Sequence, residues 1–269
     1  MSTRALIFDC DGVLADTEKD GHRVAFNRTF EEHGVPLHWS IADYGPLLTV
    51  GGGKERIRAA LTPDLLERAE LPTDAAKLDE LVLAWHRRKS ELYRQIVADG
   101  RLPGRPGVAR LAAEAMAAGW RIAVASTSAY ESVRAVARHV FAPDVADQLQ
   151  IFAGDVVSKK KPAPDIYLTA ALELGVRAAD CVAIEDSPIG CTSAVEAGMV
   201  CVVTESEYTG GDVFQGASLV VSDLGDPDGA PSVVRADPSG LEIGHEVRFE
   251  HLRRLLERKH GTTSKGQTE

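Results

Sequence analysis

Two aspartates stand directly after a short apolar run near the N-terminus. Asp9 and Asp11 follow residues 5–8 and precede Gly12, which permits a sharp turn. In an extended chain, residues two apart point to the same side, so both carboxyl groups can face one site. Adjacent carboxylates repel each other and call for a cation or a shared proton. The pair is a candidate for metal-assisted or acid–base chemistry, and a surface turn with two solvated aspartates is the alternative.

Hydroxyl and ammonium groups follow at two later points of the chain. The segment Ser126 to Ser128 comes after the apolar run 122–125. Small hydroxyls at a strand end before a helix suit phosphate oxygens, although an ordinary helix N-cap is the alternative. The lysines at 159–161 precede Pro162. A lysine held against that proline could neutralise a phosphoryl oxygen, whereas a solvated run of charge is the alternative.

An acidic pair closes a further apolar run. Glu185 and Asp186 follow residues 181–184 and precede Ser187 and Pro188. Carboxylates at the end of a buried strand are hard to explain by structure alone, because burial disfavours their charged form. Their position suits a hard cation with oxygen ligands.

The apolar runs predict the strands that must bring these groups together. They lack polar alternation, which is typical of strands buried on both faces of a parallel sheet. Helical patterns lie between them, for example at 107–119 and 187–198, each with a proline near its start and a glycine at its end. This alternation predicts an α/β fold, in which ligands bind at the carboxyl ends of the strands. The predicted strands are 5–8, 121–125, 149–152, 181–184, 200–203 and 219–221.

A long segment interrupts the alternation of strands and helices. Long amphipathic helices are predicted at 18–34 and 75–99, and no convincing strand lies near them. We interpret the segment as a helical cap inserted after the first strand. The expected boundaries are 1–16 and 103–225 for the core, 17–102 for the cap, and 226–269 for a C-terminal extension that is helical at 247–259 and disordered from 260.

The order of these motifs resembles that of the haloacid dehalogenase superfamily of phosphohydrolases. The shared pattern is DxDGV, an apolar strand ending in Ser-Thr, KKPxPD, and an apolar strand ending in Glu-Asp. The resemblance implies a Rossmann-like core with a parallel sheet and an inserted α-helical cap. The chain is more closely similar to the CbbY-like proteins, which are phosphatases of xylulose 1,5-bisphosphate, although Val13 stands where many relatives have threonine. The runs that support this closer resemblance are 16–27, 51–57, 105–108, 151–157 and 159–167.

This resemblance implies a magnesium-dependent reaction through an aspartyl-phosphate. Asp9 is the expected nucleophile, and Asp11 is expected to protonate the leaving oxygen and then to activate the hydrolytic water. Mg²⁺ is expected to bind Asp9, the backbone carbonyl of Asp11, Asp186 and, directly or through water, Glu185. The residues expected to contact the phosphoryl oxygens are the catalytic Ser126 and Lys161 and the substrate-binding Thr127 and Ser128.

A glycine-rich stretch in the cap is a candidate site for a second anion. Gly51, Gly52, Gly53 and Lys54 precede a predicted helix at 55–61. The backbone N–H groups of such a helix start, together with the lysine, can bind a distal anion. The stretch is not a Walker A loop, because no strand leads into it and a glutamate replaces the required serine or threonine. A flexible loop is the alternative.

Four further cap residues are candidates for substrate binding. Arg56 and Lys89 could assist with the distal anion, although cations on helices are often simply solvated. Glu18 and His22 could contact sugar hydroxyls, although a lone helical histidine is more often structural.

Three other functions are compatible with part of the pattern. A β-phosphoglucomutase-like isomerase would share the core motifs and differ by keeping water away from the phospho-enzyme. A haloacid dehalogenase would use one aspartate and no metal, so Asp11 and the pair Glu185–Asp186 argue against it. A catalytically inactive binding module is disfavoured because all four motifs are complete.

Bulk composition limits the remaining possibilities. The 269 residues have a formal charge of −10, which argues against a nucleic-acid partner. The resemblance implies a small sugar phosphate as the partner. The four cysteines form no CxxC pair and are expected to be reduced. No apolar run approaches the roughly 20 residues that a membrane span needs, and no N-terminal signal is evident. We expect a soluble, cytoplasmic, monomeric protein.

Overall fold

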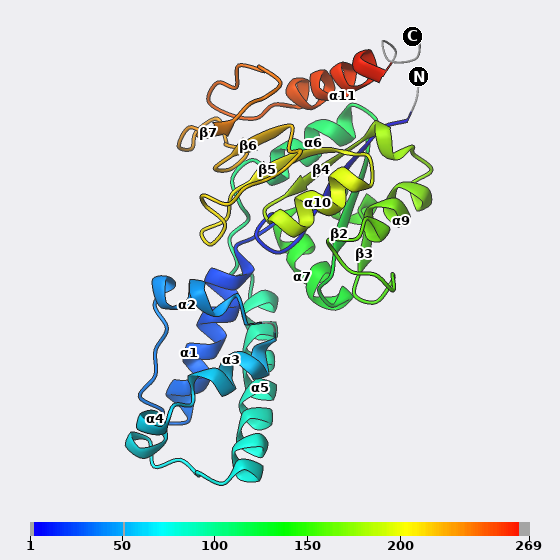
Figure 1. Cartoon of the computed structure of the whole chain (residues 1–269). Coiled ribbons are helices and arrows are strands. Elements are labelled where there is room, and N and C mark those ends of the chain that lie inside the picture. The colour runs from blue at the N-terminus through cyan, green and yellow to red at the C-terminus, as the bar shows by residue number, and fades with distance from the viewer. Residues whose placement is uncertain (1–2, 51, 264–269) are drawn as a thin grey trace. The chain divides into compact units, whose positions relative to one another are not determined.

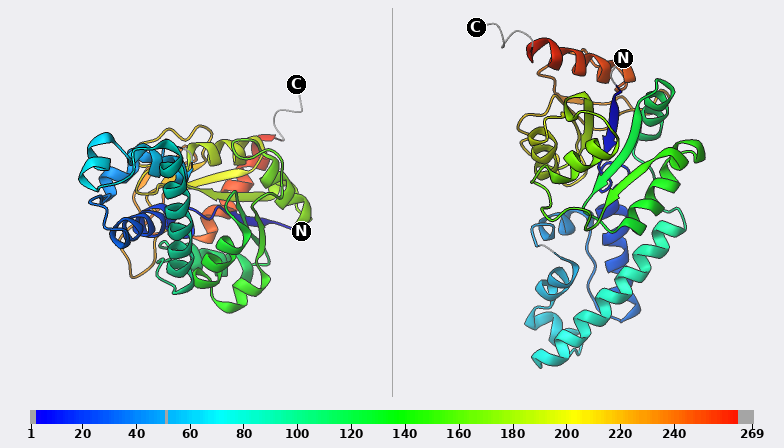
Figure 2. Two further views of the ribbon diagram at one scale, coloured as in Figure 1. Left: turned by 90° about the horizontal axis from the view of Figure 1, so that it is seen from below. Right: turned by 90° about the vertical axis from the view of Figure 1, so that its right-hand side faces the viewer.

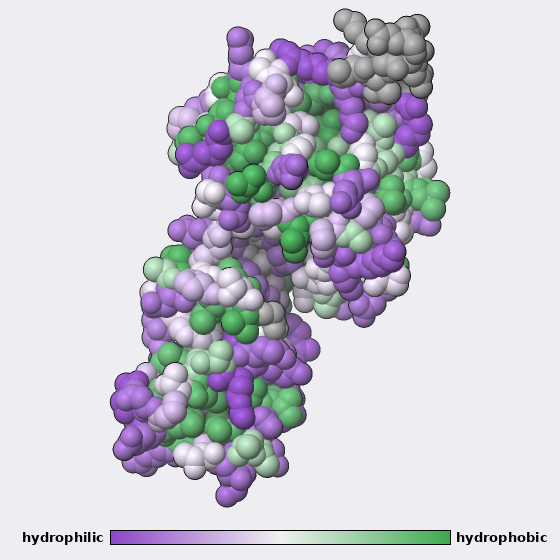
Figure 3. Space-filling view, viewed as in Figure 1, coloured by the Kyte–Doolittle hydropathy of each residue, from purple (hydrophilic) through white to green (hydrophobic). Residues whose placement is uncertain are grey.

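The chain folds into two compact units. The computed structural model describes residues 3–50 and 52–263. One unit contains residues 1–16 and 103–269, and the other contains residues 17–102. Helices and strands are labelled in Figure 1. Among the described residues, no helix is long and apolar enough to cross a lipid bilayer. On the face shown in Figure 3, hydrophilic residues predominate on both units and the hydrophobic ones form small, scattered patches.

A seven-stranded sheet forms the centre of the larger unit, in the order β3-β2-β1-β4-β5-β6-β7. All neighbouring strands are parallel except β6 and β7, which are antiparallel. The predicted α/β fold with a parallel sheet is therefore confirmed, and the antiparallel β7 is an addition at one edge. The strands are β1 Ala5–Phe8, β2 Arg121–Ser126, β3 Gln150–Ala153, β4 Cys181–Glu185, β5 Val200–Thr204, β6 Leu219–Val221 and β7 Val234–Ala236.

Helices cover both faces of this sheet (Figures 1 and 2). One layer contains α6 Val108–Ala117, α7 Tyr130–Val140, α8 Pro143–Gln148 and α11 Phe249–Thr263. The opposite layer contains α9 Asp165–Glu173 and α10 Pro188–Glu196, and a short 3₁₀ turn, η2, spans Ala178–Asp180. Mostly small and aliphatic side chains fill the space between this second layer and the sheet. Every residue of β1, β4, β5 and β6 is buried, as their unbroken apolar pattern indicated.

The register of the central strands sets the position of the site. Phe8 at the end of β1 pairs with Val124 on β2 and with Ile184 on β4. The residues that follow these three therefore lie at one edge, which is the carboxyl edge of the sheet. Parallel open sheets bind their ligands at this edge.

The smaller unit is entirely helical among its described residues, 17–50 and 52–102. Its elements are the π-helix η1 Thr17–His22 and the α-helices α1 Arg23–Glu32, α2 Ile41–Leu47, α3 Gly53–Ala60, α4 Pro63–Arg68 and α5 Ala75–Ala98. An aromatic core joins them, in which Trp39 packs edge-on against Phe26 and Phe30 with ring centroids 5.0 and 4.9 Å apart. The helix predicted at 18–34 corresponds to η1 followed directly by α1, so it begins as a π-helical turn.

The C-terminal segment packs on the sheet-containing unit. Three backbone carbonyls, of Leu224, Gly225 and Val247, accept hydrogen bonds from Arg110 on α6. Leu252 and Leu256 of α11 are fully buried. Strand β7 was not predicted, because its three residues are all exposed and form no apolar run. The prediction of disorder from residue 260 is wrong for 260–263, which continue α11, and residues 264–269 lie outside the described part of the chain.

Candidate active site

A tight loop after β1 presents the first aspartate to the carboxyl edge. The backbone N–H of Asp9 donates to the carbonyl of Ile184 at 2.9 Å, which extends the β1–β4 pairing by one residue. Gly12 then adopts a φ of +78°, and a Cβ there would lie 1.9 Å from Oδ2 of Asp186. Only glycine fits this position, because any side chain would strain the backbone and also displace the Asp186 carboxyl group.

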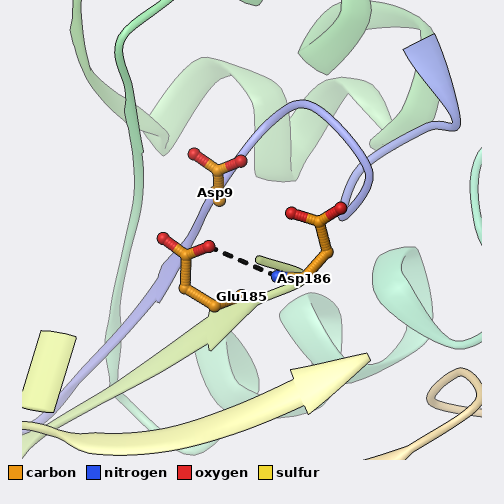
Figure 4. Close-up of side chains that lie close together, drawn as sticks. All are labelled: Asp9, Glu185 and Asp186. Carbon is orange, nitrogen blue, oxygen red and sulfur yellow. Dashed lines mark hydrogen bonds between the residues drawn. The ribbon is translucent and has the colours of Figure 1, made fainter. Parts of the chain in front are cut away.

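Three carboxylates converge at this edge (Figure 4). Asp9, Glu185 and Asp186 are all buried, and each offers an oxygen such that these atoms lie within 4.8 Å of one another. Buried carboxylates that repel each other need compensating positive charge. A set of hard oxygen donors fits a hard divalent cation such as Mg²⁺, which usually takes one or two carboxylates and keeps several waters. Asp11 is not in this cluster, and its predicted contribution was a backbone carbonyl.

Burial and mutual repulsion shift the pKa values of the carboxyl groups in this cluster. Burial, opposed by the charge of Lys161, raises the pKa of Asp9 to about 7. Burial together with the charges of Asp9 and Glu185 raises the pKa of Asp186 well above its usual value. A bound cation would favour the charged form of both groups, so the shifts fit a site built to hold one.

One ammonium lies between two of these carboxylates. Lys161 Nζ is 2.6 Å from Asp9 Oδ1 and 2.6 Å from Glu185 Oε1, and it also donates to the carbonyl of Ala125 at 3.1 Å. Burial alone would lower the pKa of Lys161, but the two carboxylates outweigh it and raise this pKa. The neighbouring Lys160 differs, since it is paired with the exposed Asp155. Lys161 is thus the lysine of the run 159–161 that lies buried among the carboxylates.

The serine-threonine segment after β2 supports the second aspartate. Ser128 Oγ donates to Asp11 Oδ2 at 2.5 Å, and its backbone N–H donates to Ser126 Oγ at 3.1 Å. Ser126 is buried, whereas Thr127 is exposed. Ser128 was predicted to bind substrate, and the structure places its hydroxyl on the carboxyl group of Asp11.

Two residues that contact this site were not singled out from the sequence. The hydroxyl of Tyr167, on α9, donates to Glu185 Oε1 at 2.5 Å. Arg105 donates through its guanidinium to the backbone carbonyls of Gly12, Thr204, Glu205 and Ser222. Arg105 therefore ties the loop after β1 to the ends of β5 and β6. Two features of the sequence could have pointed to these residues. Tyr167 lies in the first turn of the helix that KKPxPD begins, and Arg105 lies beside the boundary of the helical insert.

A polar cluster inside the helical unit contains two predicted residues. Glu18 accepts a hydrogen bond from the Tyr44 hydroxyl at 2.7 Å and lies 3.3 Å from Arg56 NH1. Arg56 also donates to the hydroxyl of Tyr44 at 2.9 Å. Arg56 is thus paired with an anion, which reduces the charge that it can offer to a phosphate. Tyr44 was missed because only the packing of α2 brings it to Glu18.

The other two predicted cap residues contact each other. Lys89 Nζ lies 2.7 Å from His22 Nδ1 and 4.5 Å from the centre of the Phe26 ring. His22 stacks on Tyr93 with ring centroids 3.9 Å apart. Burial lowers the pKa of Lys89 to about 8. The ammonium of Lys89 is nearly buried and contacts a histidine and an aromatic ring. Lys89 is therefore not a solvated helix residue, which was the alternative interpretation.

The glycine-rich stretch opens α3. Gly52 is the N-cap of this helix, with a φ of +98°, and a Cβ on Gly53 would lie 2.9 Å from the ring of His86. Gly51 lies outside the described residues. Lys54 is exposed and lines a depression with Arg58, Asp79 and Leu83.

The chain belongs to the haloacid dehalogenase-like hydrolase family, whose model matches residues 3–198, and it is therefore a hydrolase. It is 47% identical over 224 residues to a CBBY-like protein from Arabidopsis thaliana, a match that covers 83% of this chain and 70% of that one. It is 30% identical to the β-phosphoglucomutase of Bacillus subtilis, over 83% of this chain and 91% of that one. The resemblance to CbbY-like proteins is therefore confirmed.

Two solved structures of CbbY from Rhodobacter sphaeroides match the fold. One is a complex with phosphate, with a TM-score of 0.63 and 39% identity, and it covers 82% of this chain and 94% of that one. The other is a variant of the same protein in complex with xylulose 1,5-bisphosphate, with the same TM-score and coverage and 38% identity.

Proposed function

We propose that the chain is a magnesium-dependent phosphatase of sugar phosphates that acts through an aspartyl-phosphate on Asp9, with xylulose 1,5-bisphosphate as its substrate. The observation that supports this most is the buried group of Asp9, Lys161, Glu185 and Asp186 at the carboxyl edge of the sheet. The similarity to CbbY, which has been seen in complex with phosphate and with this bisphosphate, supports the substrate class. A monomeric state and a cytoplasmic location stay predictions.

The first half-reaction transfers the phosphoryl group to the enzyme. A carboxylate oxygen of Asp9 attacks phosphorus, the bond from phosphorus to the sugar oxygen breaks, and that oxygen takes a proton from Asp11. Ser128 donates to Oδ2 of Asp11 and so orients the carboxyl group that moves the proton. Lys161 and Ser126 stabilise the charge on the phosphoryl oxygens. When bound by Asp9, Glu185 and Asp186, Mg²⁺ supplies further positive charge for the transferring group.

The second half-reaction regenerates the free enzyme. Water attacks the phosphorus of the aspartyl-phosphate and gives a proton to Asp11, and the bond between phosphorus and the Asp9 oxygen breaks. Inorganic phosphate is released and Asp9 returns to its carboxylate form. A β-phosphoglucomutase-like isomerase would instead return the phosphoryl group to a sugar, and the 30% identity to such an enzyme makes this the second candidate.

A phosphate-release screen over sugar mono- and bisphosphates tests the proposal. We expect xylulose 1,5-bisphosphate to be the best substrate, EDTA to stop turnover and added Mg²⁺ to restore it. Asp9→Asn should abolish turnover with the fold retained, because the amide cannot attack phosphorus. More than a few per cent of wild-type activity in Asp9→Asn would contradict the role of Asp9. Interconversion of sugar phosphates without phosphate release would establish the isomerase instead.

A further inference from the structure

The hydroxyl of Tyr167 contacts the carboxylate cluster through Glu185. Tyr167 stands in the first turn of α9, six residues after Lys161, and its side chain is fully buried between this helix and the sheet. Its hydroxyl donates to Glu185 Oε1 at 2.5 Å and lies 3.4 Å from Lys161 Nζ. A tyrosine hydroxyl ordinarily keeps its proton at neutral pH, so it acts as the donor to this carboxylate.

The carboxylate of Glu185 is fully buried, and both of its oxygens have protein neighbours. It has no exposed surface, and Oε2 accepts a hydrogen bond from the backbone N–H of Asp186 at 3.3 Å. At Gly190 on α10, a Cβ would lie 2.0 Å from Oε2. The other oxygen, Oε1, accepts from both Tyr167 and Lys161. The rotation of this carboxylate is therefore fixed by its protein neighbours.

The ammonium of Lys161 has no hydrogen to spare in this arrangement. An ammonium group has three N–H donors. Asp9, Glu185 and the carbonyl of Ala125, at 2.6–3.1 Å, and the more distant hydroxyl of Tyr167, at 3.4 Å, already offer more acceptors than it has hydrogens. A hydrogen bond from Lys161 to a phosphoryl oxygen therefore requires that it release one of these acceptors. If it releases Glu185, a buried carboxylate loses a charged donor, which is costly unless another donor stays in place.

We propose that Tyr167 is a positioning residue, whose hydroxyl holds Glu185 in its cation-binding orientation and allows Lys161 to turn towards the phosphoryl group. When Lys161 turns away from Glu185, the Tyr167 hydroxyl remains as the donor to Oε1. This hydroxyl is neutral and does not need to move. The inference rests on the proposed function for the movement of Lys161. The orientation of Glu185 concerns cation binding alone and can be measured without any substrate.

The variant Tyr167→Phe tests this inference, because it removes the hydroxyl and keeps the ring. Ser193→Ala is the matched control. The Ser193 hydroxyl is also buried, on α10, and donates at 2.7 Å to the carbonyl of Ala163, two residues after Lys161, without contacting the carboxylates. The Kd for Mg²⁺ is measured by titration calorimetry on the full chain without substrate, and kcat and KM are measured for a phosphomonoester. Thermal melts establish that both variants are folded.

We expect Tyr167→Phe to raise the Kd for Mg²⁺ by about 10- to 100-fold, as loss of a hydrogen bond to a metal ligand typically does. We expect kcat to fall more than KM rises, and Ser193→Ala to stay within twofold of wild type in both assays. Tyr167→Phe within twofold of wild type in the Mg²⁺ titration would overturn the inference, and equal losses in the two variants would do so as well. A chain that binds Mg²⁺ in this pattern but releases no phosphate would contradict the proposed function and support the position of Tyr167.

Discussion

Lys161 neutralises buried carboxylates, and Lys161→Met tests how much stability depends on this. The ammonium lies 2.6 Å from both Asp9 and Glu185, and the lysine side chain is only 6% exposed. Methionine keeps an unbranched apolar side chain and removes the charge. Removing one partner of a buried pair typically costs about 3–5 kcal/mol. For a unit of roughly 180 residues, at about 2–4 °C per kcal/mol, the Tm of the sheet-containing unit should fall by roughly 6–20 °C.

Scanning calorimetry in EDTA and in Mg²⁺ measures this effect. Lys160→Met is the matched control, because Lys160 is adjacent in sequence but 38% exposed and paired with a fully exposed Asp155. Such a pair adds little to stability, so the control should melt close to wild type. Mg²⁺ should raise the Tm of Lys161→Met more than that of wild type, since it supplies charge that the variant lacks. Equal melting of the two lysine variants in EDTA would refute the reasoning, as would an equal effect of Mg²⁺ on Lys161→Met and wild type.

Three further predictions concern the remaining groups. Asp11→Asn should lower kcat by ~10²–10⁴-fold through loss of acid–base help, and a loss under tenfold in single-turnover assays would rule that role out. Lys54→Ala should lower kcat/KM for xylulose 1,5-bisphosphate by about 10- to 100-fold, or about 1.4–2.8 kcal/mol, and should barely affect para-nitrophenyl phosphate. Arg58→Ala, which alters an exposed cation of the same depression, is its control, and equal losses on both substrates would argue against a distal-phosphate site. Lys89 has a pKa of about 8 and loses its charge above this pH, so KM for the bisphosphate should rise from pH 8 to 9.5 in wild type but not in Lys89→Met. A pH-independent KM in wild type would exclude Lys89 from anion binding.

The core of the site was predictable because it depends on sheet geometry. Strands with unbroken apolar runs are recognised from sequence, and parallel strands present their carboxyl ends at one edge. Asp9, Glu185 and Asp186 could therefore be expected to meet. The short β7 escaped prediction because its exposed residues gain their strand conformation only by pairing with β6.

Contacts that depend on packing between elements could not be predicted in the same way. Tyr167 reaches Glu185 only because α9 packs on the face of the sheet against β2 and β3, and nothing local to the tyrosine indicates this. Arg105 binds mainly backbone carbonyls, which every residue has, so the sequence does not indicate most of its partners. Ser128 was expected close to the strand end, but its hydrogen bond to Asp11 depends on which of three adjacent hydroxyl side chains faces that carboxyl group.

The central place of β1 in the sheet has a consequence for biosynthesis. Ala5 pairs with Arg121 on one side and with Cys181 on the other, so β1 has no partner in this sheet until the whole helical insert and β2 have been made. During that time the apolar run Ala5–Phe8 is an unpaired strand, which is a site for misassembly. Asp9 is made well before its neighbours in the site and gains its surroundings only after residue 186 has emerged. Nascent chains arrested before that point should therefore depend on chaperones, while the helical insert, whose contacts are closer in sequence, can already fold.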